Sequence, residues 1–441
     1  MGSIEMIISK KIFRGGVAAP HRKNTAEIET VRMGAPEKVV IPMVQHIGAP
    51  CKPVVKKGDI VKVGQLIGQS DKYVSAPIHS SVSGTVTNIV SVVSSSGMYV
   101  DAVEIKTDGN QEIHEDVKPP IYSNDAELLG LIKQSGLVGL GGAGFPAHVK
   151  LSPPADKKID ILIVNGAECE PYITSDYREI LENSWNVISG INILMDLLKV
   201  DKVLIGIEDN KLDAIKVLTE LAATSPKIDV IKLKSRYPQG AEKMLIYSIT
   251  GRKVPVGKLP LDVGVVVMNV NSVSFIAEYV KTGMPLIKKR VTVDGPAVSN
   301  PSNVDVYIGT PLADVFEFCG GFKTEVSKVI MGGPMMGVSQ TSFSNPVMKY
   351  TNALLAFDEK SGKLSEESAC IRCAKCVNAC PMNLLPLYLN QNALHSNIDG
   401  LRKYKVMDCI ECGSCSYACP AKRHLVQSIR LGKTILKKSN A

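Results

Sequence analysis

The sequence contains no long apolar run. Its best candidate, residues 188–198, is interrupted by Gly190, Asn192 and Asp196, whereas a membrane-spanning helix needs about 18 or more consecutive apolar residues. The N-terminus also lacks the charged region, apolar region and cleavage site of a secretory signal peptide in that order. These absences predict a cytosolic chain with no transmembrane segment of its own, although partner proteins could hold it at a membrane.

Cysteine is scarce except in one repeated pattern near the C-terminus, which holds eight of the eleven. The spacing C-x2-C-x2-C-x3-C-P occurs twice, first at Cys370, Cys373, Cys376 and Cys380, and again at Cys409, Cys412, Cys415 and Cys419. Three thiolates at this spacing bind one cluster, and the fourth, placed before a proline, binds the other cluster. The pattern therefore predicts two [4Fe-4S] clusters, one on Cys370, Cys373, Cys376 and Cys419 and one on Cys409, Cys412, Cys415 and Cys380.

A zinc site and a disulfide framework are the alternatives for these cysteines. Zinc modules use two C-x2-C pairs about 15 to 20 residues apart, and disulfides are rare in chains without a secretory signal. Cys51, Cys169 and Cys319 stand alone without ligand spacing, and we expect them to be buried or free thiols. The chain is therefore expected to transfer single electrons.

The net charge of +8 raises the question of a nucleic-acid partner, but no nucleic-acid-binding motif accompanies it. Residues 361–441 hold 12 Lys and Arg against 5 Asp and Glu. Each oxidised cluster with four thiolates carries a charge of about −2, so part of this surplus offsets the clusters. The rest would suit docking of an acidic redox protein, and no nucleic acid is expected.

The 441 residues divide into regions of different pattern. Residues 1–120 begin with an extended arm and continue as short alternating strands to about residue 105. Two phrases, residues 57–65 and 76–84, resemble the halves of a biotinyl/lipoyl-like barrel-sandwich. The lysine that carries the cofactor in such barrels has no counterpart near the second phrase, so we expect no covalent cofactor here.

Alternating helices and strands follow over residues 121–287 and predict an α/β domain. A small α+β module is expected over 288–345, where residues 332–337 could be a functional loop but are expected to be a packing turn. A linker rich in Asn, Ser and Lys would then lead to the cysteine domain at 360–430. The fold class is therefore multidomain, α/β plus α+β.

Residues 139–144 formally match G-x-G-x-x-G. The dinucleotide fingerprint needs a strand directly before its glycines, but here a predicted helix precedes them and the strand at 159–164 follows. An ordinary Rossmann NAD site is therefore disfavoured. The loop is either a phosphate cradle, assisted by Lys150 and a helix N-terminus, or a tight structural turn.

Polar residues also follow three predicted elements of the α/β domain. They lie at residues 165–172 with Thr174, Asp176 and Arg178, at residues 236–243 and at residues 269–271. Side chains beyond the carboxyl ends of parallel strands line the usual ligand crevice of an α/β sheet. Each group alone could be a solvated loop, but their recurrence predicts a shared site.

These stretches resemble known proteins. Residues 139–150, followed by 165–170, are similar to the flavin- and NADH-binding loops of the NADH-oxidising subunit of respiratory complex I. The order of parts resembles the RnfC family of the Rnf ion-translocating ferredoxin:NAD+ oxidoreductases, as do residues 11–16, 45–50 and 237–243. The resemblance covers essentially the full chain and implies a β-grasp (SLBB-like) fold for the α+β module and a ferredoxin-like helical fold for the cysteine domain.

The resemblance also implies cofactors, partners and place. Non-covalent FMN would be held by Gly139, Gly141, Gly142, Gly144, Lys150, Asn165, Gly240, Glu242, Asn269 and Asn271. Glu168 and Glu170 would bind the nicotinamide or its ribose and serve as the catalytic pair. The expected reaction is hydride exchange between NAD(H) and FMN, with single electrons relayed through both clusters. The partners would be the other subunits of a membrane-bound Rnf complex, with an iron-sulfur subunit and ferredoxin in the electron path, at the cytoplasmic face of the membrane.

Two alternatives remain open. A cobalamin reductase of the type found with diol-utilising microcompartments shares the flavin loop, the β-grasp module and the twin cluster motifs. In that family the barrel follows the cluster domain, whereas here it precedes it. The other alternative is an electron-relay subunit whose glycine loop binds neither flavin nor nucleotide.

Overall fold

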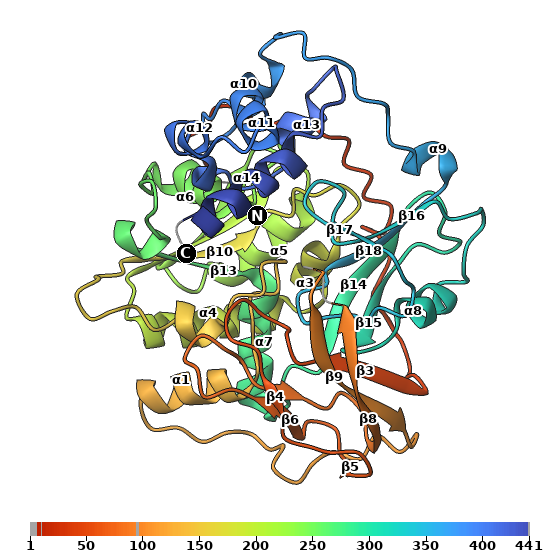
Figure 1. The fold of residues 1–441 in the computed structure, drawn as a ribbon. Helices are drawn as coiled ribbons and strands as arrows, with labels where there is room; N and C mark the ends of the chain where they lie inside the picture. The colour runs from red at the N-terminus through yellow and green to blue at the C-terminus, as the bar shows by residue number, and fades with distance from the viewer. Residues whose placement is uncertain (1–6, 10, 94–96, 440–441) are drawn as a thin grey trace.

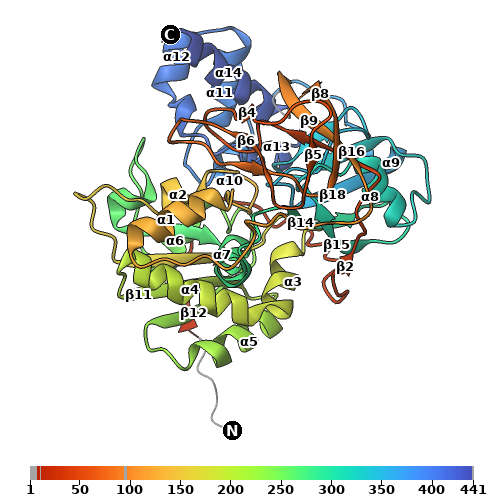
Figure 2. The same cartoon turned by 90° about the horizontal axis from the view of Figure 1, so that it is seen from below.

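The computed structural model describes residues 7–9, 11–93 and 97–439. Residues 1–6 and 10 of the predicted arm lie outside the described residues. The helices of the cysteine domain lie at one end of the molecule and the barrel at the opposite end, with the α/β domain and a mixed sheet side by side between them (Figures 1 and 2). No helix among the described residues is long and apolar enough to cross a lipid bilayer.

The barrel consists of two small antiparallel sheets. Their strand orders are β3-β9-β8-β5 and β4-β6-β7. The strands are β3 (Lys38–Pro42), β4 (Lys52–Pro53), β5 (Ile60–Val61), β6 (Leu66–Gln69), β7 (Ile78–His79), β8 (Gly84–Val93) and β9 (Tyr99–Thr107). Alternate side chains such as Val39, Ile41, Val103 and Ile105 meet in one core, which is the consequence of the alternating pattern.

The α/β domain is built on a parallel sheet of order β1-β12-β11-β10-β13. Its strands are β1 (Ile7–Ile8), β10 (Ile161–Gly166), β11 (Lys202–Glu208), β12 (Ile228–Leu233) and β13 (Val265–Asn269). Its helices are α1 (Asp125–Gln134), α2 (Ala147–Lys150), α3 (Ser175–Glu182), α4 (Ser184–Leu198), α5 (Leu212–Ala222), α6 (Glu242–Thr250), η1 (Pro260–Val263) and α7 (Val270–Thr282). On β10, Leu162 packs in the core with α1, α4, α5 and α7, whereas Ile163 packs in the core with α6. Both faces are therefore covered, which explains the continuous apolar strand sequences.

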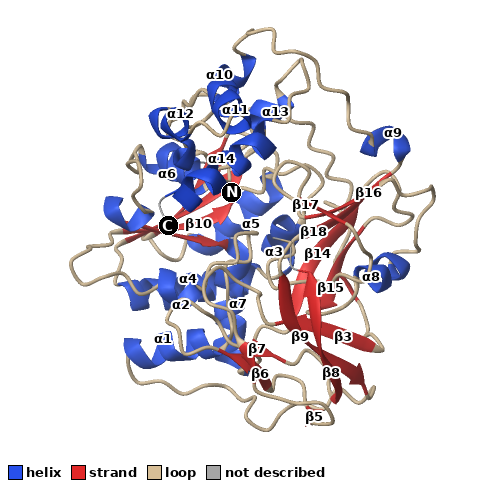
Figure 3. Cartoon of the chain, viewed as in Figure 1, coloured by secondary structure: helices blue, strands red, loops and turns tan. Residues whose placement is uncertain are grey.

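The mixed sheet has the order β17-β16-β18-β14-β15-β2, and its strands β16, β18, β14 and β15 are seen side by side in Figure 3. It contains β2 (Val31–Arg32), β14 (Lys288–Asp294), β15 (Ser302–Tyr307), β16 (Lys328–Met331), β17 (Val338–Gln340) and β18 (Ala353–Phe357), with helix α8 (Leu312–Phe318) packed against it. The linker prediction was wrong at β18, which is buried along its whole length between β14 and β16. Its uninterrupted apolar run was the sequence signal for a buried strand.

The described residues of the N-terminal arm form two short strands, each paired with a strand of a larger sheet. β1 pairs with β12, as Ile7 lies opposite Ile231, and β2 pairs with β15, as Val31 lies opposite Val304. The arm therefore contributes edge strands to two different sheets and ties them together.

The cysteine domain is helical, as expected. It follows the short helix α9 (Glu359–Gly362) and contains α10 (Lys375–Ala379), α11 (Pro386–Leu394), α12 (Ile398–Lys403), η2 (Val406–Asp408), α13 (Ser414–Tyr417) and α14 (Leu425–Ser439). Leu389, Leu401, Val406 and Ile429 form its core. The predicted fold class, with a barrel, an α/β domain, an α+β module and a helical cysteine domain in that order, is confirmed.

Candidate functional site

The carboxyl ends of β10 and β13 define the crevice of the α/β sheet. The chain leaves β10 toward β11 and β12 and later returns to β13 on the other side of β10. In open α/β sheets, ligands bind where the strand order reverses in this way. Asn165 and Asn269 lie opposite each other at this point, at the ends of the two strands. Two of the predicted flavin residues therefore flank the switch point.

The glycine loop forms the mouth of this crevice. Gly139 donates its N–H to the Phe145 carbonyl at 2.8 Å, and Gly144 donates to the Gly139 carbonyl at 3.2 Å. Between them, Gly141, Gly142 and Ala143 are exposed, and within the described chain their N–H groups have no hydrogen-bond partner. Three free N–H groups on one tight turn are the arrangement that anions bind in proteins.

Glycine is required at Gly144. Its φ is +63°, and an added Cβ would lie 3.1 Å from the Tyr350 ring. A side chain at this position would therefore be strained in its backbone and crowded by Tyr350.

Lys150 and Glu242 meet across the crevice. Their Nζ and Oε1 atoms are 2.6 Å apart, and about a third of each side chain is exposed. Asn165 donates its amide to the Gly240 carbonyl at 2.9 Å. The predicted flavin residues from α2, β10 and the start of α6 are thus brought together.

Asp176, one of the polar residues that follow β10, links two further predicted residues. Asn269 donates its amide to Asp176 Oδ2 at 2.9 Å, and the Asn271 amide donates to Asp176 Oδ1. Burial raises the pKa of Asp176, and the two amides oppose this shift. Its position at the start of α3 was visible in the sequence, but its partners lie about a hundred residues away on β13 and α7.

Glu168 is buried beneath the crevice. Its Oε1 accepts the Asp176 N–H at 2.7 Å, while Oε2 lacks a hydrogen-bond partner among the described residues and lies 3.9 Å from Lys23 Nζ. Burial raises the pKa of Glu168 to about 7, against the attraction of Lys23. Lys23 comes from the arm, and no local sequence pattern identified it.

Glu170 points toward the mixed sheet. Its two carboxylate oxygens accept the N–H groups of Met335 and Met336, each at 3.0 Å. Burial raises the pKa of Glu170 to about 7, although these two hydrogen bonds favour the charged form. The turn at residues 332–337, which was expected to be a packing turn, therefore cradles a predicted catalytic carboxylate.

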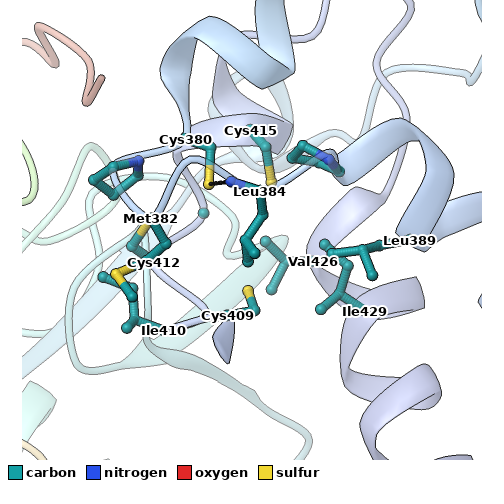
Figure 4. A pocket seen from close by; sticks show the side chains of 13 residues that line it. Cys380, Met382, Leu384, Leu389, Cys409, Ile410, Cys412, Cys415, Val426 and Ile429 are labelled. Atoms are coloured by element: carbon teal, nitrogen blue, oxygen red, sulfur yellow. Dashed lines mark hydrogen bonds between the residues drawn. The ribbon is translucent and has the colours of Figure 1, made fainter. Parts of the chain in front are cut away.

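The eight motif cysteines line two separate cavities in the crossed sets that the spacing predicts. Cys380, Cys409, Cys412 and Cys415 surround one cavity with apolar side chains that include Leu384 and Ile429 (Figure 4). Cys370, Cys373, Cys376 and Cys419 line the other. Within the described ranges no three His, Cys, Asp or Glu side chains converge on a single-ion position. Four thiols around each cavity are the donor set of a four-iron cluster, and the residues fit that group.

The two cavities differ in burial. Cys412 and Cys415 are buried, whereas Cys370 and Cys373 are exposed. At the buried set, the Leu384 N–H donates to Cys380 Sγ and the Glu411 N–H donates to Cys409 Sγ, each at 3.3 Å. We refer to these sets below as the buried and the exposed cluster sites.

The fit to a flavin rests on this chain's own atoms. The free N–H groups at residues 141–143 and the positive charge of Lys150 suit a phosphate. The unpartnered Glu168 carboxylate oxygen suits a ligand that donates a hydrogen bond. The residues of the crevice therefore fit a phosphate-bearing cofactor. Near Glu168 they fit a ligand that donates a hydrogen bond.

Comparison with protein families matches four models along the chain. These are the RnfC barrel sandwich hybrid domain at residues 11–110, the Nuo51 FMN-binding domain at 132–278, the SLBB domain at 290–339 and the 4Fe-4S dicluster domain at 363–420. They occur in the order that the sequence predicted.

Relatives match over nearly the whole chain. The corresponding subunit of the Na(+)-translocating ferredoxin:NAD(+) oxidoreductase complex of Acetobacterium woodii is 46% identical over 97% of this chain and 98% of its own length. Its counterpart in the proton-translocating complex of Clostridium ljungdahlii is 47% identical over 96% and 94%. Among solved structures, an NAD+-reducing [NiFe]-hydrogenase in the air-oxidized state matches 72% of this chain and 66% of its own chain, at 17% identity and a TM-score of 0.50, which reflects fold alone.

Proposed function

The chain belongs to the RnfC family of ion-translocating ferredoxin:NAD+ oxidoreductase complexes, and we infer that it exchanges electrons between NAD(H) and its partner subunits. The observation that carries this inference is the presence of two crossed four-cysteine sites and a flavin-type crevice in one chain. FMN, when bound, supplies the change from two-electron hydride chemistry to single-electron transfer. The protein's part is to position the cofactors and to connect them.

The crevice residues would hold the flavin as follows. The phosphate would lie against the N–H groups of residues 139–144 and the Lys150 ammonium. The remaining pocket would be lined by Asn165, Gly240, Glu242, Asn269 and Asn271. Asp176 orients the two asparagine amides of β13 and α7, so we assign it a positioning role.

Glu168 and Glu170 would bind the nicotinamide end of NAD(H). The support is that both lie just beyond β10 and that Glu168 has an oxygen free to accept a hydrogen bond. Lys23 donates to the carbonyls of both residues at 2.9 Å and so fixes the backbone that carries them. We expect the carboxylates to orient NAD(H) rather than to move its hydride.

Burial suggests the order of the two clusters. The buried cluster site adjoins the α/β domain through the 2.6 Å hydrogen bond from Tyr237 to Cys412, whereas residues 363–375, which carry Cys370 and Cys373, are all exposed. We therefore place the buried cluster next to the flavin and the exposed cluster next to the partner. Ile371 is 67% exposed, and among the described residues Arg372 and Lys375 form no ion pair, so an acidic one-electron protein suits this surface.

We place the chain peripherally on the cytoplasmic face of the membrane, where NAD(H) and ferredoxin are available. Protease treatment of inside-out vesicles should cleave this protein, and right-side-out vesicles should protect it. Protection in inside-out vesicles would contradict the assignment.

Anaerobic reconstitution with iron, sulfide and FMN tests the cofactor content. We expect about eight irons per chain and one FMN that is retained on gel filtration and released by acid. A chain with about eight irons that retains no flavin would be an electron relay only.

A further inference from the structure

Tyr237 joins the α/β domain to a ligand of the buried cluster site. Its hydroxyl donates to the main-chain carbonyl of Cys412 at 2.6 Å and also lies beside the Glu170 carboxylate, and the residue is 2% exposed. Its backbone is held on the other side, because Val17 and Tyr237 exchange both main-chain hydrogen bonds, at 2.8 and 3.0 Å. The ring is therefore fixed at both its base and its tip.

The same segment reaches the flavin crevice within six residues. Gly240 donates its N–H to Cys169 Sγ at 3.3 Å and accepts from the Asn165 amide, and Glu242 pairs with Lys150. Residues 237–242 thus have one end on a cluster ligand and the other end among the predicted flavin residues. No other hydrogen bond from the crevice segments to a cluster ligand is found among the described residues.

A second contact fixes the same ligand loop. An added Cβ at Gly413 would lie 2.8 Å from the Met335 carbonyl, and Met335 donates its N–H to Glu170. The peptide that joins Cys412 to Gly413 therefore lies between Tyr237 and the turn that cradles Glu170. This peptide is the point where the crevice and the buried cluster site meet.

We propose that Tyr237 is a positioning residue that makes the buried cluster easier to reduce. The O–H dipole directs its positive end at the Cys412 carbonyl, and hydrogen bonds around the ligands set cluster potential together with burial. A donor at this point stabilises the form with the additional negative charge. The cluster gains one electron on reduction, and the tyrosine keeps its proton.

The test is an EPR-monitored redox titration of the full, reconstituted chain with dithionite. The inference rests on the proposed function for its place in the electron path, but dithionite reduction needs neither NADH nor flavin, so the two can fail separately. In Tyr237→Phe, one of the two cluster steps should shift to a more negative potential while the other stays unchanged. Iron content and the other step report whether the fold is intact.

Replacement of Tyr237 by 3-fluorotyrosine keeps the ring and hydroxyl and makes the hydroxyl a stronger donor, so the same step should shift to a more positive potential. Tyr417→Phe is the control, because Tyr417 is an exposed tyrosine of the cysteine domain, 49% exposed; neither step should shift. Opposite shifts for phenylalanine and fluorotyrosine support the proposal. If Tyr237→Phe loses iron, the fluorotyrosine protein alone decides, and an unchanged potential there overturns the proposal.

Discussion

Lys150 at the end of α2 and Glu242 at the start of α6 form a 2.6 Å ion pair across the mouth of the α/β crevice. Both residues are predicted to line FMN, so their contact shows that the two elements approach closely enough to share one ligand. A lysine placed here can exchange its carboxylate partner for a phosphate, since both are oxyanions.

Lys150→Ala is therefore expected to weaken FMN binding by about 10- to 100-fold, the equivalent of one charged hydrogen bond. Fluorescence titration of flavin-free protein with FMN measures this directly. Lys157→Ala is the matched control, because Lys157 forms a similar ion pair with Asp262 at 3.1 Å. Equal FMN affinities in the two variants would show that Lys150 does not contribute to FMN binding.

The crossed ligation of the clusters can be tested by pairing substitutions. Cys380→Ser combined with Cys412→Ser removes two ligands of the buried site and should leave about four irons per chain. Cys380→Ser combined with Cys376→Ser affects both sites and should leave far fewer. Cys319→Ser, in the core beside the mixed sheet, should keep about eight. The opposite ranking of the two double variants would mean that each motif binds its own cluster.

Gly240 is a position where a single methyl group should disturb the site. An added Cβ would lie 2.2 Å from the Ala167 carbonyl, so Gly240→Ala must push the 237–242 segment away from β10 at a cost of about 1–3 kcal/mol. We expect a lower Tm and loss of FMN. Gly130→Ala is the control, because nothing lies within 4 Å of its added Cβ in helix α1 and alanine favours a helix. If Gly240→Ala retained the wild-type Tm and bound flavin, Gly240 would not lie as close to the Ala167 carbonyl as the structure shows.

Glu170 should make stability depend on pH. Burial raises its pKa to about 7, above about 4.3 in an unfolded chain, so the folded state binds the extra proton between these values. Its contribution to stability is fully present below the lower value and is lost as the pH rises through the upper one, by about 1.4 kcal/mol per pH unit. Glu170→Gln cannot titrate.

The Tm of the wild type, measured relative to Glu170→Gln, should therefore fall between about pH 5.5 and about pH 8. Differential scanning fluorimetry of both proteins in the same buffers measures the difference. A difference that stays constant across this range would show that Glu170 has the same pKa in the folded and unfolded chain.

The exposed surface at residues 363–375 should govern electron exchange with an acidic partner. Arg372→Glu together with Lys375→Glu should slow the second-order reaction with an acidic two-cluster ferredoxin by about tenfold or more at low ionic strength. Stopped-flow mixing measures the rate. The same charge change at Lys437 and Lys438, at the end of α14, should have a much smaller effect. Equal slowing by both pairs would indicate only a general effect of net charge.

The grouping of the eight motif cysteines around two cavities could be predicted because their spacing is local and chemically restrictive. The order of the α/β elements was also readable, since apolar periodicity is a property of short windows. By contrast, Lys23 lies 145 residues from Glu168, and Tyr237 lies 175 residues from Cys412. Such contacts depend on how domains pack, and no spacing rule in the sequence encodes them.

Strand β18 was wrongly predicted to be part of a linker, and the reason is different. Residues 353–357 form a short apolar run that is typical of a buried strand, but their neighbours are the polar residues of a linker. The strand takes its place only because β14 and β16 flank it in the sheet. The apolar pattern of a strand was present in these residues, but whether they form a strand depends on the neighbouring strands of the folded sheet.

We propose that electrons from NADH reach both clusters within this single chain. Anaerobic rapid mixing of the fully loaded protein with NADH, followed by freeze-quench EPR, tests it most directly. We expect loss of flavin absorbance together with the appearance of reduced-cluster EPR signals. Protein that carries FMN and about eight irons, gives cluster signals with dithionite and gives none with NADH would contradict it.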